Sequence, residues 1–272
     1  MGSVRKTRKL RASDYVIAIP SYKRVETLKE KTLAVLKKYK IESSKIHIFV
    51  ADKDEENAYK DGLAKGTYGK IVVGIKGIKE IRNFITEYFP IGKKIICMDD
   101  DIKEFLEYDE KAPRKEKQLT SLKRVFEKGF TEAHKQGFRL WGIYPIANGF
   151  FMKPTVSNDL KFIVGVCFGI INPGSNKLKI PVDMKTDYYI TLRMYELDGG
   201  VIRMNNVAPK TAYYKEAGGI QADEGRQKKS KDAAEMLIKL YPEWVKLNPN
   251  RKSGFVEIRI KDSKRKIDKY EE

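Results

Sequence analysis

The stretch Lys94–Phe105, "KIICMDDDIKEF", decides the fold, because a run of strand-forming apolar residues ends directly in three aspartates. Residues Lys94–Met98 have the composition of a buried strand. Asp99, Asp100 and Asp101 repel one another when all three are ionised. Either they lie on a solvated turn or a helix N-cap, where aspartate is favoured, or a positive group sits among them. The remainder of the sequence decides between these interpretations.

Strands and helices alternate along the first part of the chain. We predict strands over Asp14–Pro20, Lys45–Asp52, Lys70–Ile75 and Lys94–Met98. Apolar residues at helical spacing predict helices over Val25–Tyr39 and Ile78–Tyr88, the second ending near Pro90. The strands are apolar with little alternation, which is typical of strands covered on both faces. This pattern predicts an α/β fold with a mixed, mostly parallel sheet and helices on both faces.

The second part of the chain is less regular. We expect a charged loop at 108–118, a helix at 119–133, strands within 138–151 and 160–173 that form a hairpin, a helix at 186–199 leading into 200–206, a mobile basic loop at 217–231, a helix at 231–244 and a strand at 254–261. No repeat or clear linker interrupts this order. We therefore predict one domain over 14–260, between a basic arm (1–13) and a charged tail (261–272).

The charge balance points to a polyanionic partner. The 272 residues include 55 Lys and Arg against 37 Asp and Glu, a formal net charge of +18. A protein this basic attracts polyanions, of which nucleic acid is the commonest and an anionic membrane surface the second. The alternative is that surplus lysine keeps the protein soluble. We favour a polyanion because several basic clusters are local.

The two cysteines, Cys97 and Cys167, lie inside apolar runs and lack the spacing of metal ligands. We expect buried free thiols from a reducing compartment. The sequence has no apolar run long enough to span a bilayer, and its basic start has no apolar segment behind it. We expect a soluble, cytoplasmic protein with no membrane insertion.

Several functional classes are excluded by missing motifs. No GxGxxG follows the first strand and no GxxxxGK[ST] occurs, which argues against a dinucleotide-binding Rossmann domain and a P-loop NTPase. The only histidines, His47 and His134, fall in a predicted strand and a predicted helix. A histidine-based metal site or a Ser-His-Asp triad is therefore not expected.

The ends of the predicted strands supply a candidate ligand site. In open α/β sheets ligands bind beyond the carboxyl ends of the strands, where Pro20–Arg24, Asp52–Asp54 and Asp99–Asp101 would converge. An Asp-x-Asp at a strand end can place two carboxylates near one Mg²⁺ or Mn²⁺. Such a metal neutralises a leaving diphosphate. The position of the triplet after a fourth apolar strand favours this interpretation over a solvated turn.

Four segments carry a family resemblance. In order, "IAIPSYKR" (17–24), "IFVADKDE" (48–55), "GIKGIKEIRNFI" (74–85) and "IICMDDDI" (95–102) resemble the nucleotide-sugar half of GT-A fold glycosyltransferases. More narrowly, the chain resembles the TET-associated glycosyltransferases, over about residues 14–215. The resemblance implies a GT-A-like (Rossmann-like) fold, with a nucleotide-sugar half (14–108) and an acceptor half (109–260).

The resemblance also implies an activity. Members of that family are implied to add sugars to hydroxymethylated pyrimidines in DNA, mainly in phages and related viruses. The expected enzyme is a hexosyltransferase, inverting at the sugar, that uses a UDP-sugar and Mn²⁺ or Mg²⁺ in the host cytoplasm. The alternatives are a glycosyltransferase with a protein, lipid or glycan acceptor, and a non-catalytic nucleic-acid-binding protein on the same scaffold.

Site residues follow from the same resemblance. The residues that it places around the nucleotide-sugar are Pro20, Ser21, Arg24, Asp52, Arg82, Asn83, Asp99 and Asp100. Asp52 is expected at the base or ribose, and Arg82 and Asn83 near the sugar or diphosphate. Asp99 and Asp101 match the two ends of the DxD motif and are the expected metal ligands, with Asp101 favoured for direct contact.

A later segment suggests the catalytic base. "VDMKTDYYITLR" (182–193) resembles the element that holds the base of inverting enzymes, although Thr186 stands where that pattern often has an acid. This leaves Asp187 as the expected base, with Asp183 as the alternative. A helix-starting acid, which the helix dipole favours, is the competing interpretation of Asp187.

Basic and aromatic segments are candidates for the acceptor. "RKTRKLR" (5–11), "GRQKKSK" (225–231) and "KDSKRK" (261–266) offer cations to phosphates. The aromatic candidates for contact with a base are Trp141, Tyr144, Phe150 and Phe151, and core packing is the alternative for most of them.

Overall fold

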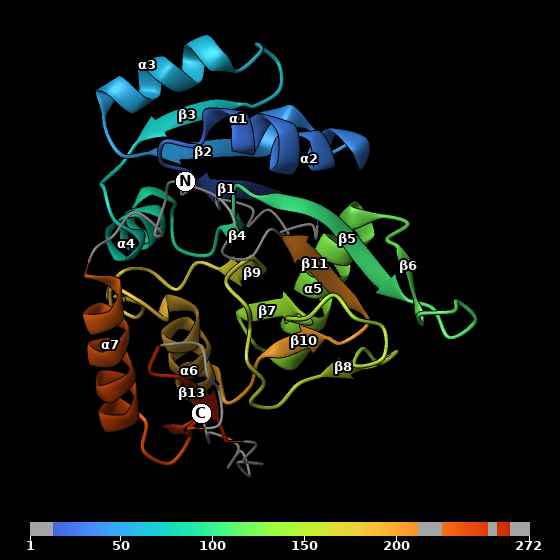
Figure 1. Cartoon of the computed structure of the whole chain (residues 1–272), viewed down its shortest axis with the longest axis vertical. Helices are drawn as coiled ribbons and strands as arrows, with labels where there is room; N and C mark the ends of the chain where they lie inside the picture. The colour runs from blue at the N-terminus through green and yellow to red at the C-terminus, as the bar shows by residue number, and fades with distance from the viewer. Residues whose placement is uncertain (1–12, 212–224, 250–254, 262–272) are drawn as a thin grey trace, which may run out of the picture.

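An eight-stranded sheet organises the computed structural model, which describes residues 13–211, 225–249 and 255–261 (Figure 1). Its strands, in spatial order, are β3 (Lys70–Val73), β2 (Ile46–Val50), β1 (Tyr15–Pro20), β4 (Lys94–Met98), β9 (Cys167–Ile171), β7 (Leu140–Ile143), β10 (Ile202–Met204) and β8 (Val156–Ser157). Every strand pairs in parallel except where β9 or β8 takes part. The predicted mixed, mostly parallel sheet is confirmed.

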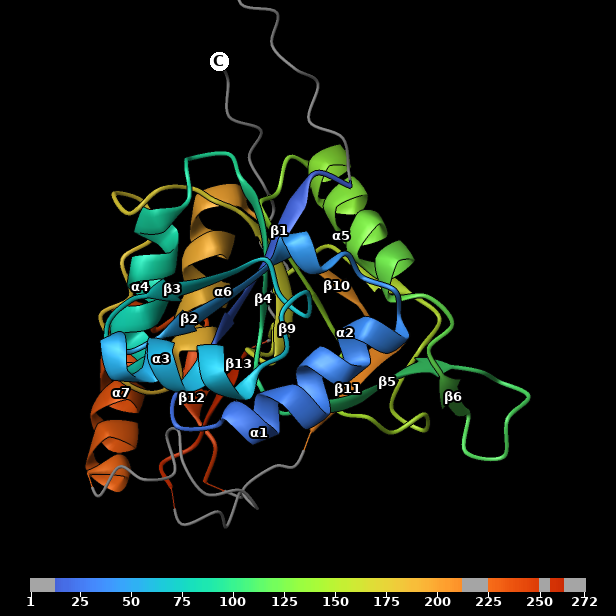
Figure 2. The same cartoon turned by 90° about the horizontal axis from the view of Figure 1, so that it is seen from above.

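Helices cover both faces of this sheet, as predicted. Along β1, Ile17 and Ile19 point into one apolar cluster, whereas Ala18 belongs to a second cluster on the opposite face. The helices of the first face are α1 (Val25–Leu28), α2 (Ala34–Lys38), α3 (Lys53–Gly62) and α5 (Leu122–Gln136). Those of the second face are α4 (Ile78–Tyr88), α6 (Thr186–Asp198) and α7 (Arg226–Leu240). Figure 2 shows the sheet between α4 and α6 on one side and α5 on the other.

Two smaller sheets complete the described chain. β11 (Val207–Thr211), β5 (Ile102–Tyr108) and β6 (Glu116–Gln118) form an antiparallel sheet in which Thr211 pairs with Ile102, directly after the aspartate triplet. β12 (Val245–Leu247) pairs with β13 (Ile258–Ile260). The main sheet takes strands from both predicted halves of the chain.

Most predicted elements are present, with shifted ends. The predicted helix Val25–Tyr39 is α1 and α2 joined by a π-helical turn, Lys29–Leu33. The predicted strands within 138–151 and 160–173 are β7 and β9, which pair in antiparallel fashion. They do not form a simple hairpin, because β8 lies between them in the sequence.

Other predictions were incomplete or wrong. Two elements, α3 and β5, were not predicted, and the predicted loop 108–118 includes β6. The predicted mobile loop 217–231 is wrong for its last residues, because α7 begins at Arg226, and 217–224 lie outside the described residues. The arm 1–13 and the tail 261–272 lie outside them too, except Ser13 and Lys261. No helix in the described ranges is long and apolar enough to cross a membrane.

A tryptophan fixes the packing of α5 on the sheet. Trp141 of β7 is fully buried, and its indole ring occupies the space where a Cβ on Gly129 of α5 would lie, with ring atoms 2.3–2.6 Å away. On β9, the strand that pairs with β7, a Cβ on Gly169 would lie 2.1–2.5 Å from ring atoms of Trp141. Both glycines are therefore needed for space.

We expect Gly129→Ala to lower the free energy of unfolding by about 1–3 kcal/mol, because the added methyl overpacks the Trp141 site. In an ordinary helix the same change stabilises by about 1 kcal/mol, so the sign separates the two effects. Urea unfolding measures it, with the exposed neighbour Lys128→Ala as control. A stabilised Gly129→Ala variant would contradict the packing described.

Candidate functional site

A cleft of about 980 Å³ opens at the carboxyl ends of β1, β2 and β4. Its other walls are the start of α4, the segment Val164–Val166 and the residues that lead into α6. The predicted site residues that line it are Pro20, Ser21, Arg24, Arg82, Asp99, Asp100, Asp101, Asp183 and Asp187. The structure thus brings these residues, far apart in the sequence, into one cavity.

A cation does sit among the aspartates. The guanidinium of Arg24 lies 3.1 Å from Asp100 and 3.8 Å from Asp101. Asp100 is buried and also accepts a 2.6 Å hydrogen bond from the hydroxyl of Ser21. Burial raises the pKa of Asp100, whereas the bonds from Ser21 and Arg24 lower it. Asp100 is therefore turned toward β1 and the residues after it.

Tyr59 of α3 anchors this corner. Its buried hydroxyl hydrogen-bonds the Ser21 hydroxyl at 2.7 Å and accepts from the backbone N–H of Arg24 at 3.1 Å. Tyr59 was not predicted as a site residue because its helix, α3, was not predicted. A signal was present, since Asp52 caps this helix by accepting from the N–H of Glu55, an Asp-x-x-Glu start.

Thr32 hydrogen-bonds the backbone at both ends of the aspartate triplet. Its hydroxyl donates to the backbone oxygen of Asp99 at 2.8 Å and accepts from the N–H of Ile102 at 3.0 Å. Thr32 is fully buried within the π-helical turn. Two backbone groups that flank the charged residues are thereby satisfied, which fixes the path of the chain between β4 and β5.

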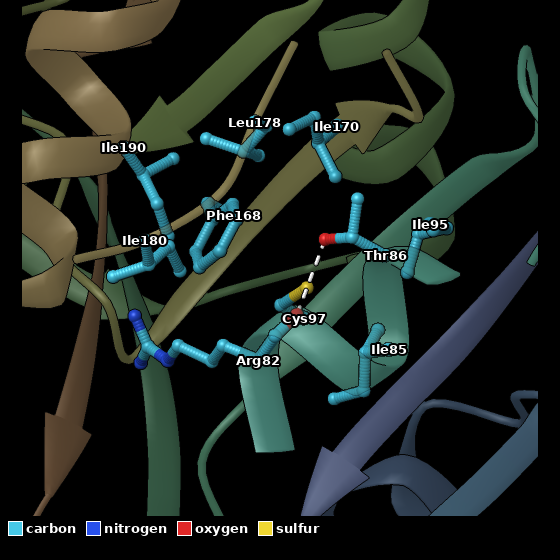
Figure 3. Close-up of a pocket in the computed structure, with 10 residues that line it drawn as sticks. All are labelled: Arg82, Ile85, Thr86, Ile95, Cys97, Phe168, Ile170, Leu178, Ile180 and Ile190. Carbon is cyan, nitrogen blue, oxygen red and sulfur yellow. Dashed lines mark hydrogen bonds between the residues drawn. The ribbon is translucent and has the colours of Figure 1, made fainter. Parts of the chain in front are cut away.

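Arg82 of α4 lies near Asp99, the first aspartate of the triplet. Its guanidinium is 3.9 Å from the carboxylate of Asp99 and is 11% exposed. Figure 3 shows Arg82 extending from α4 past Phe168 at the edge of a small cavity with mainly aliphatic walls. Within the described part of the chain, Nη1 of Arg82 is buried without a hydrogen-bond partner. A buried, incompletely paired guanidinium is suited to an anionic ligand.

Asp99 has a strongly altered acidity. Its pKa is raised to about 7, mainly by burial and also by the negative charges of Asp101, Asp100 and Asp187, while the charge of Arg82 opposes the shift. The carboxylate is nonetheless 36% exposed, so it meets the solvent of the cleft. A carboxylate under this repulsion gains from a nearby cation.

Asp187 and Asp183 have different surroundings. Asp187, in the first turn of α6, accepts from the N–H of Gly165 at 3.2 Å and from that of Tyr188 at 3.0 Å. Burial raises the pKa of Asp187, and the charge of Arg82 lowers it. Asp183 is 47% exposed and lies 2.8 Å from the ammonium group of Lys79. Asp187 therefore belongs to the Arg82–Asp99 group, whereas Asp183 lies at the rim.

Two residues expected to contact the sugar donor, Asp52 and Asn83, do not line the cleft. The side chain of Asp52 is exposed and caps α3. Asn83 pairs with the backbone of Ile180 in both directions, accepting from its N–H at 2.8 Å and donating to its oxygen at 3.0 Å. Both side chains have structural partners in this conformation.

The segments expected to contact the acceptor lie in different places. From the basic segment 225–231, Arg226 and Lys229 line the cleft. None of the four aromatic candidates lines the cleft. Trp141 lies in the core, and Phe150 and Phe151 are exposed outside the cleft.

Both cysteines are free, with Cys167 buried and Cys97 partly buried. Burial raises the pKa of Cys97 to about 12.

Two carboxylates of the cleft, those of Asp99 and Asp101, are suited to bind a divalent metal ion. Across the described ranges, no group of three acidic, histidine or cysteine side chains could hold a metal by itself. Asp100 is engaged by Ser21 and Arg24, which leaves Asp99 and Asp101, 36% and 20% exposed, facing the cleft. Mg²⁺ and its analogues commonly take one or two carboxylates and complete their shell with phosphate oxygens and water.

Comparisons with known proteins show the fold. No family model matches the sequence, and no match is found among curated proteins. The mannosyltransferase PcManGT from Pyrobaculum calidifontis, solved with GDP-Man and Mn²⁺, matches with a TM-score of 0.52 and 11% identity, over 85% of this chain and 63% of its own. S. aureus TarS with UDP matches with a TM-score of 0.48 and 13% identity, over 84% and 72%. The predicted GT-A-like fold class is confirmed by the likeness to the mannosyltransferase.

The acidity of Asp99 predicts a pH dependence of stability. In the metal-free folded chain the pKa of Asp99 is about 7, whereas the ordinary value of an aspartate, as in the unfolded chain, is 3.8. Between these two pH values the folded state therefore holds a proton that the unfolded state has lost. The contribution of Asp99 to the unfolding free energy decreases as the pH rises through this range.

We therefore expect the unfolding free energy of the wild type, relative to Asp99→Asn, to fall between about pH 4 and about pH 7. Urea unfolding at a series of pH values, with a chelator present, measures this difference. Asp61→Asn, at an exposed position of α3, provides the matched control and should run parallel to the wild type. If the curve of Asp99→Asn also ran parallel to that of the wild type, the pKa of Asp99 would not be raised in the folded state.

Proposed function

We propose that this chain is a metal-dependent, inverting glycosyltransferase that moves a hexose from a UDP-sugar to the hydroxymethyl group of a modified pyrimidine in DNA. The observation that carries the proposal is the incompletely paired Arg82 guanidinium beside Asp99 and Asp187, in a cleft at the strand ends of this fold. The resemblance of the four N-terminal segments to nucleotide-sugar enzymes supports the same assignment.

Arg82 is proposed to bind the diphosphate of the donor. Its guanidinium is nearly buried among apolar groups, and so its attraction for an anion is weakly screened. Diphosphate oxygens would supply the acceptors that Nη1 lacks in the described structure. Pro20, Ser21 and Arg24 are proposed for the nucleoside end, where they line the same cleft. Asp52 and Asn83 take no direct part, because their side chains are bonded elsewhere.

Asp99 and Asp101 are the proposed ligands of Mn²⁺ or Mg²⁺. The mutual repulsion of the aspartates supports this, as does the Mn²⁺ with which the mannosyltransferase of similar fold was solved. When bound, the metal would supply the Lewis-acid chemistry that neutralises charge on the leaving diphosphate.

Asp187 is the proposed general base. Its carboxylate takes the proton of the acceptor hydroxyl, whose oxygen attacks the anomeric carbon while the bond from that carbon to the diphosphate breaks. The raised pKa of Asp187 makes it a stronger base than an ordinary carboxylate. Two backbone N–H groups orient its oxygens, which supports a defined direction for proton transfer.

DNA is the proposed acceptor because of charge. The chain carries a net charge of +18, and Arg226 and Lys229 add cations to the wall of the cleft. These cations suit the phosphates of a nucleic-acid backbone. A base inside a duplex cannot easily reach a recessed site, so the proposal includes flipping of the nucleotide or approach through the major groove.

A substrate matrix tests the proposal. UDP-hexoses and GDP-mannose are incubated with Mn²⁺ and with hydroxymethylcytosine DNA, hydroxymethyluracil DNA or plain DNA. Mass spectrometry of the digested nucleosides detects the added hexose. We expect transfer to a hydroxymethylated DNA only, and its loss with a chelator.

Two results would replace the proposal. Turnover with a protein, lipid or glycan acceptor, and none with DNA, would change the acceptor class. Salt-sensitive DNA binding without transfer of any sugar would favour a non-catalytic nucleic-acid-binding protein.

We expect Asp187→Asn to lower the turnover number at least about 100-fold, since general-base catalysis contributes typically 10²–10⁴-fold. Donor and metal affinity should stay within about threefold, because the amide has nearly the size of the carboxylate and its oxygen still accepts one of the two backbone N–H bonds. Asp183→Asn, which removes the carboxylate at the rim, is the matched control. Loss of turnover in Asp183→Asn with activity retained in Asp187→Asn would reverse the assignment.

A further inference from the structure

We infer that Gly165 is a positioning residue that holds Arg82 and Asp187 at their working separation. The inference depends on the proposed function for the roles of these two side chains, whereas the geometry of Gly165 stands by itself. Gly165 lies in the segment before β9 and lines the cleft between α4 and α6. A glycine within a strand-like sequence, "FIVGVCFG", is the signal that such a close approach leaves.

The backbone of this segment bonds to three charged residues of the site. The N–H of Gly165 donates to Asp187 at 3.2 Å, and its carbonyl oxygen is 3.5 Å from Nη2 of Arg82. The oxygen of the next residue, Val166, accepts from the N–H of Asp99 at 2.9 Å. The backbone groups of two adjacent residues thereby contact the proposed diphosphate-binding cation, the proposed base and a proposed metal ligand.

The space at Gly165 is already filled by the same residues. A Cβ on Gly165 would lie 2.9 Å from Nη2 and 3.3 Å from Nη1 of Arg82, and 3.2 Å from the Cβ of Asp187. Gly165 is not among the glycines with positive φ. The glycine is therefore needed for its missing side chain rather than for its backbone freedom.

Neither neighbour has much freedom to retreat. The guanidinium of Arg82 lies 5.8 Å from the ring centre of Phe168, and Phe168 is buried. Asp187 is fixed by two backbone donors, and its own carbonyl accepts from the buried hydroxyl of Thr191 at 2.8 Å. A methyl group on Gly165 would thus push Arg82 away from Asp99 or displace Asp187.

A double-mutant cycle tests the inference. Gly165→Ala is made in the wild type and in R82K, which lacks the two guanidinium nitrogens that the methyl would meet. In the wild type we expect the donor KM to rise about tenfold and kcat to fall, because both partners are disturbed. In R82K the same change should alter the donor KM less than about twofold, while part of the kcat effect, due to Asp187, remains.

Thermal unfolding of the ligand-free variants provides a second readout. Gly165→Ala should lower Tm by a few degrees in the wild type and by less in R82K. Val164→Ala, the adjacent change in the same segment, is the control and should cost the same in both backgrounds. Equal costs of Gly165→Ala in both backgrounds, in KM and in Tm, would overturn the inference.

The two readouts separate this inference from the proposed function. If the wild type transfers no sugar in any donor and acceptor combination, the proposed function fails. The Tm cycle then still decides whether Gly165 acts through Arg82.

Discussion

The balance of charge at the end of β4 is the constraint around which the site is organised. Three consecutive carboxylates follow a buried strand, and an arginine approaches them from each side: Arg24 at Asp100 and Asp101, and Arg82 at Asp99. The two arginines come from opposite faces of the sheet, since Arg24 precedes α1 and Arg82 lies in α4. The cleft is the space between these two cations, where the carboxylates that remain exposed meet solvent.

The surrounding elements hold this balance in place. Tyr59 reaches from α3 to fix the turn that carries Ser21 and Arg24, and Thr32 reaches from the π-helical turn to fix the backbone around the triplet. The irregular turn in the first helix therefore has a structural use, because it carries a buried hydroxyl that serves two backbone groups.

The sequence predicted the first four strands, the helices between most of them and the convergence of Ser21, Arg24 and the aspartates, whereas Arg82 was placed there only by the family resemblance. Such predictions succeed because apolar runs and strand order determine which loops share an edge. It did not predict β5, whose alternating "IKEFLEY" resembles a charged loop, or the part of Gly165, which depends on contacts between residues far apart in the chain. The donor contacts expected of Asp52 and Asn83 stay predictions, because in the ligand-free structure their side chains bond to the protein itself.

The paired hydrogen bonds between Asn83 and Ile180 have a mechanical consequence. They fasten α4 to the segment that leads into α6, one residue after Arg82 and shortly before Asp187. The element that carries Arg82 is thus tied to the chain that leads to Asp187 by two backbone bonds of one side chain. At the rim the two segments also meet through the ion pair of Lys79 and Asp183, which is partly exposed and therefore weaker than a buried bond.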